Sequence, residues 1–156
     1  ELKKEFDDII YCGMGDMQNY PDFTAHARLG VYRAKVKDFM SYNIKPQESG
    51  NRCDVRYAVI RNGEGAGLMI LADAAPFNLN AKEISDNGLA ACRHAEDITP
   101  AQDRNYISVD GFVGGLGSGS CGPRPLKEYR LNADEAYFTS FTLIPFTSVK
   151  DENIIF

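Results

Sequence analysis

The sequence of 156 residues has no tryptophan, only two histidines and no stretch of eighteen apolar residues. Its longest apolar segment, residues 67–72, has the length of a strand, so the sequence predicts no membrane-spanning helix. No run of Lys or Arg exceeds two residues and the net charge is −5, which argues against nucleic acid and membrane surfaces as partners. An uncharged partner, such as a sugar or another protein domain, is favoured.

Metal-ligand spacing is also missing. The four cysteines are widely separated and form no CxxC pair: Cys12, Cys53, Cys92 and Cys121. His26 and His94 have no neighbour at metal-ligand spacing, so both are interpreted as structural histidines and no metal site is predicted. Cys53 lies in a strand pattern and is interpreted as a small buried hydrophobic residue.

Two glycine-rich segments resemble nucleotide-binding loops only formally. Residues 117–122 match GxGxxG, but Pro123 and Pro125 follow and exclude the regular helix that such a loop must open. The segment at Gly13 and Gly15 is followed by Tyr20-Pro21 and lacks the closing glycine. No GxSxG occurs either, so nucleotide binding and esterase chemistry are not predicted.

Alternation with a period of two dominates the chain and predicts strands. Residues 32–36 and 52–59 alternate apolar and charged positions, and Asn62-Gly63 predicts the turn of a hairpin whose second strand is 67–72. Further strands are predicted at 77–79, 106–112 and 136–146, the last covered on both faces. One short helical segment, interrupted at Asn87-Gly88, is predicted within 81–95. The chain is therefore predicted to be all-β, an antiparallel β-sandwich.

Acidic residues do not form a recognisable catalytic pair. Glycoside hydrolysis needs two carboxyl groups roughly 5 to 9.5 Å apart. The available acids cannot be placed together from sequence: Asp22, Glu48, Asp54, Asp73 and Asp110. Asp54, between Arg52 and Arg56 on one predicted strand face, is expected to form salt bridges. No catalytic residue is predicted.

Four stretches together resemble the C-terminal, small-chain region of bacterial family 2 glycoside hydrolases of the β-galactosidase type. They are residues 11–22 (YCGMGDMQNYPD), 46–56 (PQESGNRCDVR), 77–80 (FNLN) followed by 94–98 (HAEDI), and 110–131 with its Gly-rich loop. The second stretch is very close to the family pattern. Asp16, Gln18 and Phe23 depart from the first pattern, which puts in doubt a sugar-facing role for that loop.

The resemblance implies a large multidomain parent enzyme. Its two catalytic glutamates and its Mg and Na ions would lie on a separate TIM barrel, so no cofactor is expected in this fragment. Residues 1–156 would form a single domain, part of a supersandwich related to galactose mutarotases, and the strand pattern at residues 1–6 agrees with an excised fragment. The expected partners are the parent's other domains and a galactoside, in a homo-oligomer that is cytoplasmic or periplasmic in a bacterium.

The resemblance also singles out the Gly-rich loop. In the best-known members this loop presents a Trp that stacks on the sugar in the active site. Here the substrate-loop residues are Gly119, Ser120 and Cys121, with Cys121 at the Trp position. A thiol offers no aromatic face for the sugar, so substrate preference should differ; alternatively, Cys121 packs beneath the loop.

Two other functions stay open at this stage. A stand-alone carbohydrate-binding module would use Tyr20, Tyr42 or Tyr129 as stacking surfaces. A mutarotase-like epimerase would need an acid and a base, for which His94 and Glu48 are the nominal pair.

Overall fold

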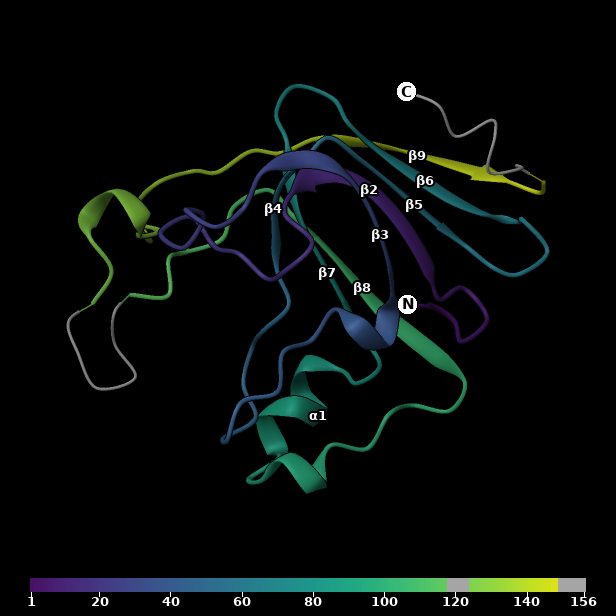
Figure 1. Cartoon of the computed structure of the whole chain (residues 1–156). Helices are drawn as coiled ribbons and strands as arrows, with labels where there is room; N and C mark the ends of the chain where they lie inside the picture. Colours follow the sequence, from purple (N-terminus) through teal and green to yellow (C-terminus); the bar gives the residue numbers. More distant parts are fainter. Residues whose placement is uncertain (118–123, 149–156) are drawn as a thin grey trace.

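The computed structural model describes residues 1–117 and 124–148 and contains two antiparallel sheets (Figure 1). One has four strands in the order β1-β8-β7-β4, and the other has five in the order β3-β2-β5-β6-β9. The elements are β1 (Leu2–Lys3), β2 (Asp8–Met14), β3 (Leu29–Lys35), η1 (Val36–Asp38), β4 (Arg52–Val55), β5 (Tyr57–Arg61), β6 (Gly67–Ala72), β7 (Phe77–Lys82), α1 (Asp86–Ala91), η2 (Ala95–Asp97), β8 (Arg104–Asp110), η3 (Lys127–Tyr129) and β9 (Phe141–Phe146). This confirms the predicted antiparallel β-sandwich.

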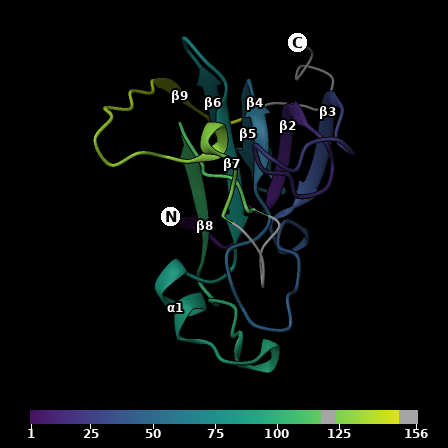
Figure 2. The ribbon, with the colours of Figure 1, turned by 90° about the vertical axis from the view of Figure 1, so that its left-hand side faces the viewer.

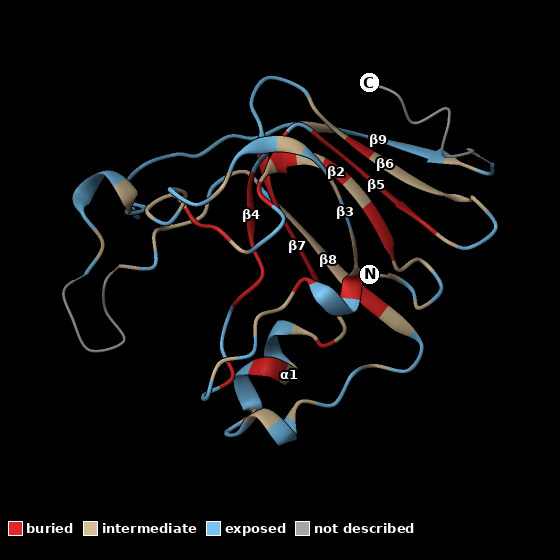
Figure 3. Cartoon of the chain, in the orientation of Figure 1, coloured by how far each residue is buried: buried red, intermediate tan, exposed pale blue. Residues whose placement is uncertain are grey.

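The core lies between the two sheets (Figure 3). Ile9 and Ile60 enter it from the five-stranded sheet, and Leu79 enters it from the four-stranded sheet. The inward face of β3 is as predicted, since Tyr32 and Ala34 pack against this core. Burial of these apolar side chains is the main source of stability.

The predicted hairpin is present, with a longer turn than expected. Strands β5 and β6 pair from Tyr57↔Leu71 to Arg61↔Gly67. The Asn62 side chain closes the turn by accepting hydrogen bonds from the backbone N–H groups of Glu64 and Ala66, each at 3.0 Å. The positive φ is at Gly65 (84°), three residues after Asn62.

The predicted strand 52–59 is two strands in different sheets. β4 pairs with β7, whereas β5 pairs with β2 and β6. A register irregularity between Arg52 and Val55 contains Asp54, whose φ is +53°. The irregularity turns Arg52 inward and leaves Asp54 exposed, so the prediction that the two share one salt-bridged face is wrong.

The helical segment is shorter than predicted because its first residues belong to a strand. Residues 81–82 close β7, and α1 begins only after Ser85, whose hydroxyl accepts a hydrogen bond from the Gly88 N–H at 3.1 Å. Asn87-Gly88 lies inside α1 and does not interrupt it. Figures 1 and 2 show α1 beyond one end of β7 and β8, whereas the chain leaves the other end of β8 toward residues 111–117.

The last two strands differ from the prediction in different ways. β8 has the predicted length but begins and ends two residues earlier, at Arg104 and Asp110, whereas β9 covers only the second half of the predicted strand 136–146. The expectation that this strand is covered on both faces is wrong, because Leu143 and Ile144 are 52% and 41% exposed. β9 lies at the edge of its sheet, and Figure 3 shows most of it coloured as exposed.

Candidate functional site

A buried polar network joins three of the four sequence motifs. The Asn19 amide donates to the carbonyl oxygens of Met14 (2.7 Å) and Met17 (2.9 Å), and its oxygen accepts the Cys53 N–H at 2.8 Å. The Asn51 amide donates to the Asn19 carbonyl at 2.9 Å and to the Asn78 side chain at 3.4 Å. Asn19, Asn51 and Asn78 thus form hydrogen bonds with groups that belong to one another's motifs. This mutual dependence gives a structural reason why the three motifs occur together in the sequence.

Arg52 is the largest fully buried side chain and holds this network to the turn after β2. Its guanidinium donates to the Tyr11 hydroxyl (3.0 Å) and to the carbonyl oxygens of Gly50 (2.8 Å) and Asp16 (2.9 Å). It also lies over the Phe39 ring, 4.7 Å from the centroid. The charge is thus surrounded by oxygens and a π face, which a buried cation requires.

Asp22 connects the first motif to the root of the Gly-rich loop. Its two carboxylate oxygens accept the backbone N–H groups of Leu116 (2.8 Å) and Gly117 (2.7 Å). The Gly115 N–H donates to the Tyr129 carbonyl at 2.7 Å on the far side of the loop. A Cβ at position 115 would lie 2.6 Å from the Asp22 carboxyl carbon, so this close approach needs glycine.

A cavity of about 630 Å³ lies beside this loop root and is lined by Asp22, Phe23, Leu116 and Tyr129 among others. The predicted substrate-loop residues Gly119, Ser120 and Cys121 lie outside the described residues. The structure therefore describes how the loop is held at its base, on either side of these residues.

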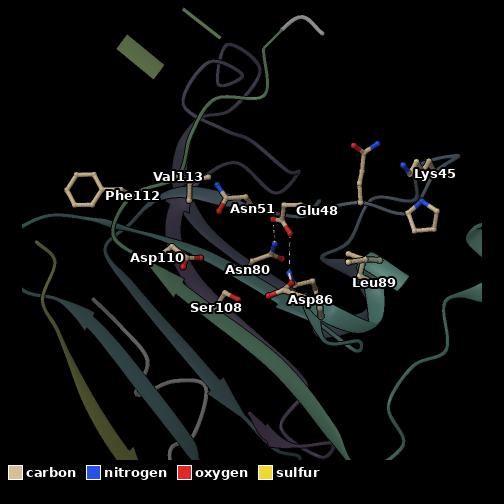
Figure 4. Close-up of a pocket in the computed structure, with 14 residues that line it drawn as sticks. Lys45, Glu48, Asn51, Asn80, Asp86, Leu89, Ser108, Asp110, Phe112 and Val113 are labelled. Atoms are coloured by element: carbon tan, nitrogen blue, oxygen red, sulfur yellow. Dashed lines mark hydrogen bonds and ion pairs between the residues drawn. The ribbon is translucent and has the colours of Figure 1, made fainter. Parts of the chain in front are cut away.

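A second cavity, of about 670 Å³, lies on the face of β7 and β8 that points away from the core (Figure 4). Alternation explains its polar floor: Phe77, Leu79 and Ala81 enter the core, so Asn80 and Lys82 point the other way. Ser108 lies directly opposite Asn80 on β8, and Asp110 lies opposite Asn78. Glu48 reaches the same space from the segment before β4, and Asp86 from the start of α1.

Lys82 is 3% exposed and bridges two carboxylates of this cavity. Its ammonium group pairs with Glu48 at 3.1 Å and with Asp86. Burial lowers the pKa of Lys82, but its contacts with Asp86 and Glu48 outweigh burial and raise the pKa above the usual range. The amine therefore stays protonated at neutral pH and is unsuited to act as a nucleophile.

Asp110 has a different environment from Glu48. The Glu48 carboxylate accepts from Asn80 (2.7 Å) as well as from Lys82. Within the described residues, the Asp110 carboxylate has no hydrogen bond or ion pair, and partial burial together with the charge of Glu48 raises its pKa. Its carboxylate is therefore open to a ligand, unlike that of Glu48.

The structure brings together some of the acids named from sequence and separates others. Glu48 and Asp110 share the cavity on β7 and β8. Asp22 lies instead at the root of the Gly-rich loop, and Asp73 accepts a hydrogen bond from Thr142 of β9 at 2.8 Å. Sequence reasoning missed Lys82 as a site residue. The signal for it was the polar alternation Asn78, Asn80, Lys82 in a strand whose other residues are apolar.

The structure also places two residues that the sequence suggested for other functions, Tyr20 for sugar stacking and His94 for acid–base chemistry. Tyr20 is buried, with its hydroxyl 3.4 Å from Glu48, so it offers no stacking face to a sugar. His94 precedes η2, where the Asp97 carboxylate accepts its backbone N–H at 2.9 Å, and it does not line the cavity that contains Glu48. Nothing in this geometry supports a His94–Glu48 acid–base pair.

The described residues contain neither a helix that could span a membrane nor a cluster of metal ligands. None of their helices is long and apolar enough to cross a membrane. No three of their His, Cys, Asp or Glu side chains gather so that they could hold a metal ion. Cys53 is buried, as predicted, and burial raises the pKa of its thiol to about 11, which keeps it protonated.

Comparison with known proteins gives consistent matches. Residues 1–143 match the family model described as the β-galactosidase small chain. The chain is 35% identical over 139 residues to the β-galactosidase of Kluyveromyces lactis, a match that covers 88% of this chain and 13% of that protein. It is 33% identical over 145 residues to the β-galactosidase of Priestia megaterium, covering 92% of this chain and 14% of that protein. The β-galactosidase of Lactobacillus delbrueckii subsp. bulgaricus is 35% identical over 139 residues, with 86% and 13% covered. The chain thus spans only a small part of the length of these relatives.

Proposed function

Because this chain belongs to the β-galactosidase small-chain family, we propose that it is the non-catalytic C-terminal β-sandwich part of a family 2 glycoside hydrolase. In this proposal the parent enzyme cleaves terminal β-galactosides, and its two catalytic glutamates lie on a separate barrel domain. The Gly-rich loop after Gly117 reaches into the sugar-binding site of that barrel. The name β-galactosidase of the relatives supports the reaction class.

The main support for the loop's role is the clamp that Asp22 makes on two consecutive backbone amides, at 2.8 and 2.7 Å. A loop that positions a side chain against a substrate must have a fixed base, because small displacements of a contacting group lower the rate strongly. The clamp spans 94 and 95 residues of sequence and joins the first family motif to the fourth. Cys121 would then stand where relatives of the best-known type present an aromatic ring.

The Mg and Na ions expected of the parent family are placed, in this proposal, on its other domains. The described residues fit such ions poorly, since no three acidic, His or Cys side chains gather as ligands. In this proposal the chain therefore contributes the β-sandwich that carries the Gly-rich loop and fixes its position.

The exposed apolar side chains on and before β9 fit a contact with another part of the parent protein. Leu143 and Ile144 are consecutive and point to opposite faces of the edge strand, yet both are exposed, as is Phe138 before the strand. Exposed apolar side chains on an edge strand are typical of an interaction site. We assign this strand to a contact with a neighbouring domain of the parent enzyme.

The test uses the complete β-galactosidase polypeptide that carries this chain. Asp22→Ala removes both acceptors at the loop base and should lower kcat/KM for an aryl β-galactoside by about tenfold to a hundredfold. Asp103→Ala, at an exposed carboxylate just before β8 and so at the opposite end of that strand from the loop, is the matched control and should leave kcat/KM unchanged. Equal kcat/KM values for Asp22→Ala and the control would refute the loop's role.

The 156-residue chain by itself should not hydrolyse the same aryl β-galactoside above a buffer blank. Turnover that is abolished by Glu48→Gln or Asp110→Asn would instead locate the reaction in this chain and overturn the non-catalytic assignment.

A further inference from the structure

The cavity on β7 and β8 shares no lining residue with the cavity at the loop root, so the two are separate spaces. Its volume of about 670 Å³ falls in the range of small-molecule sites, about 300–1,000 Å³. Figure 4 shows Asp110, Ser108, Asn80 and Glu48 around one space, with Phe112 at one end and Lys45 at the other.

The floor of the cavity is built by backbone pairing and is therefore rigid. Asn80 and Ser108 are directly opposed across β7 and β8, and Asp110 follows Ser108 on the same face of β8. Asn80 is held by hydrogen bonds to Glu48 (2.7 Å) and to the Ser49 carbonyl (2.9 Å). Polar groups on strands, oriented by a second layer of hydrogen bonds, are typical of preformed binding sites.

The walls supply the apolar surface that a small ligand also needs. Leu89 and Ala90 of α1 stand on one side, Pro46 comes from the segment before β4, and Phe112 and Val113 follow β8. A few converging polar groups among apolar walls are the usual composition of a ligand pocket.

The charges select among ligands. Three carboxylates, on Glu48, Asp86 and Asp110, face two ammonium groups, on Lys45 and Lys82. Lys82 is already engaged by Glu48 and Asp86, so an anionic ligand would meet an excess of negative charge without a free cation near the floor. A metal ion would find only one open carboxylate, and the described residues contain no group of three potential ligands.

The open groups suit hydroxyls. Asp110 can only accept hydrogen bonds when it is ionised, whereas the Ser108 hydroxyl can donate or accept. A ligand hydroxyl can do both, and a sugar ring carries several hydroxyls, so one ring offers a separate partner to each of the two groups. The apolar C–H surface of the ring would lie against the walls.

We propose that this cavity binds a neutral monosaccharide, with sugar hydroxyls donating to the Asp110 carboxylate and accepting from Ser108. This site goes beyond the loop function proposed above and does not require it.

The test is calorimetric titration of the 156-residue chain with D-galactose, D-glucose and, as the anionic probe, D-galacturonate. We expect a neutral hexose to bind with a Kd on the order of 1 mM and galacturonate to bind at least tenfold more weakly. Tighter binding of galacturonate than of either neutral hexose, or flat heats with both hexoses, would overturn the proposal.

Asp110→Asn keeps the shape of the side chain and removes the charged acceptor, so it should weaken hexose binding about tenfold or more. Asp103→Asn, the same change outside the cavity, should leave the Kd unchanged. Ser108→Leu fills the cavity and should abolish binding, and thermal unfolding checks that each variant is folded. Unchanged hexose binding in both Asp110→Asn and Ser108→Leu would place the sugar elsewhere. These results are distinguishable from those of Asp22→Ala, which leaves this cavity untouched.

Discussion

On the four-stranded sheet the polar residues Asn80 and Lys82 are buried, whereas on the five-stranded sheet the apolar residues Leu143 and Ile144 are exposed. The difference lies in what covers each region. The segment before β4 and α1 cover β7 and provide the ion-pair partners of Lys82, whereas β9 packs against the core with Phe141 and leaves Leu143 and Ile144 exposed. Buried polar groups need partners within the chain, while exposed apolar groups indicate a surface that contacts something else.

The largest expected effect is at Arg52, on the polar side of this comparison. Arg52→Met should lower the free energy of unfolding by about 3 kcal/mol or more, because the Tyr11 hydroxyl and the Gly50 and Asp16 carbonyls lose their donor. Urea denaturation measures the change. Arg56→Met, four residues along and exposed, is the matched control and should stay within about 0.5 kcal/mol. Similar losses in both variants would contradict the central role of Arg52.

A smaller effect is expected at Asp8, a buried carboxylate on β2. It accepts from Arg33 (2.8 Å) and from Arg61 (2.7 Å), and Asp8→Asn should cost about 2 kcal/mol because the buried Arg61 loses its nearest anion. Burial raises the pKa of Asp8, but the two arginines outweigh it and lower the pKa below 3.8.

The pH dependence follows from that lowered pKa. The stabilisation by Asp8 is fully present above the ordinary carboxyl pKa and is lost as the pH falls through the lowered pKa of the folded state. The difference in unfolding free energy between the wild type and Asp8→Asn should therefore be constant from pH 7 to about 5 and shrink below about pH 4. If the difference in unfolding free energy between the two proteins grew toward low pH, the pKa of Asp8 would be raised in the folded state, which would refute its stabilisation by the two arginines.

The smallest effect is expected on the exposed strand. Leu143→Thr should change the unfolding free energy by no more than about 0.5 kcal/mol, because the side chain is half exposed and threonine suits a strand. Its cross-strand partner Ile70 is buried, so Ile70→Thr should cost about 3 kcal/mol in the same urea titration. A loss of similar size at Leu143 would mean that β9 is part of the core.

The all-β fold and the hairpin could be predicted because period-two alternation is a local property of the sequence. The division of residues 52–61 between two sheets could not, since it depends on the irregularity at Asp54 and on pairing with distant strands. Likewise, the β-branched and aromatic residues of β9 predict a strand, but whether its faces are covered depends on what packs against it.

The candidate sites show the same limit. The motifs identified Asp22, Glu48 and Asp110 from sequence, but their distances follow from loops that bring residues 22 and 116 together. Lys82 was overlooked because a lysine in a strand usually points to solvent, and only the cover of Glu48 and Asp86 explains its burial. The roles of Gly119, Ser120 and Cys121 stay predictions.

The passage of the chain from one sheet to the other at Arg56 has a further consequence. This residue donates its N–H to the Cys12 carbonyl and accepts the Ala72 N–H, so the single residue between β4 and β5 is bonded to β2 and to the end of β6. The two layers cannot separate without breaking this corner. Amide hydrogens of β5 and β7 should therefore exchange with solvent through one cooperative opening. Hydrogen exchange should then give the same protection factor for both strands.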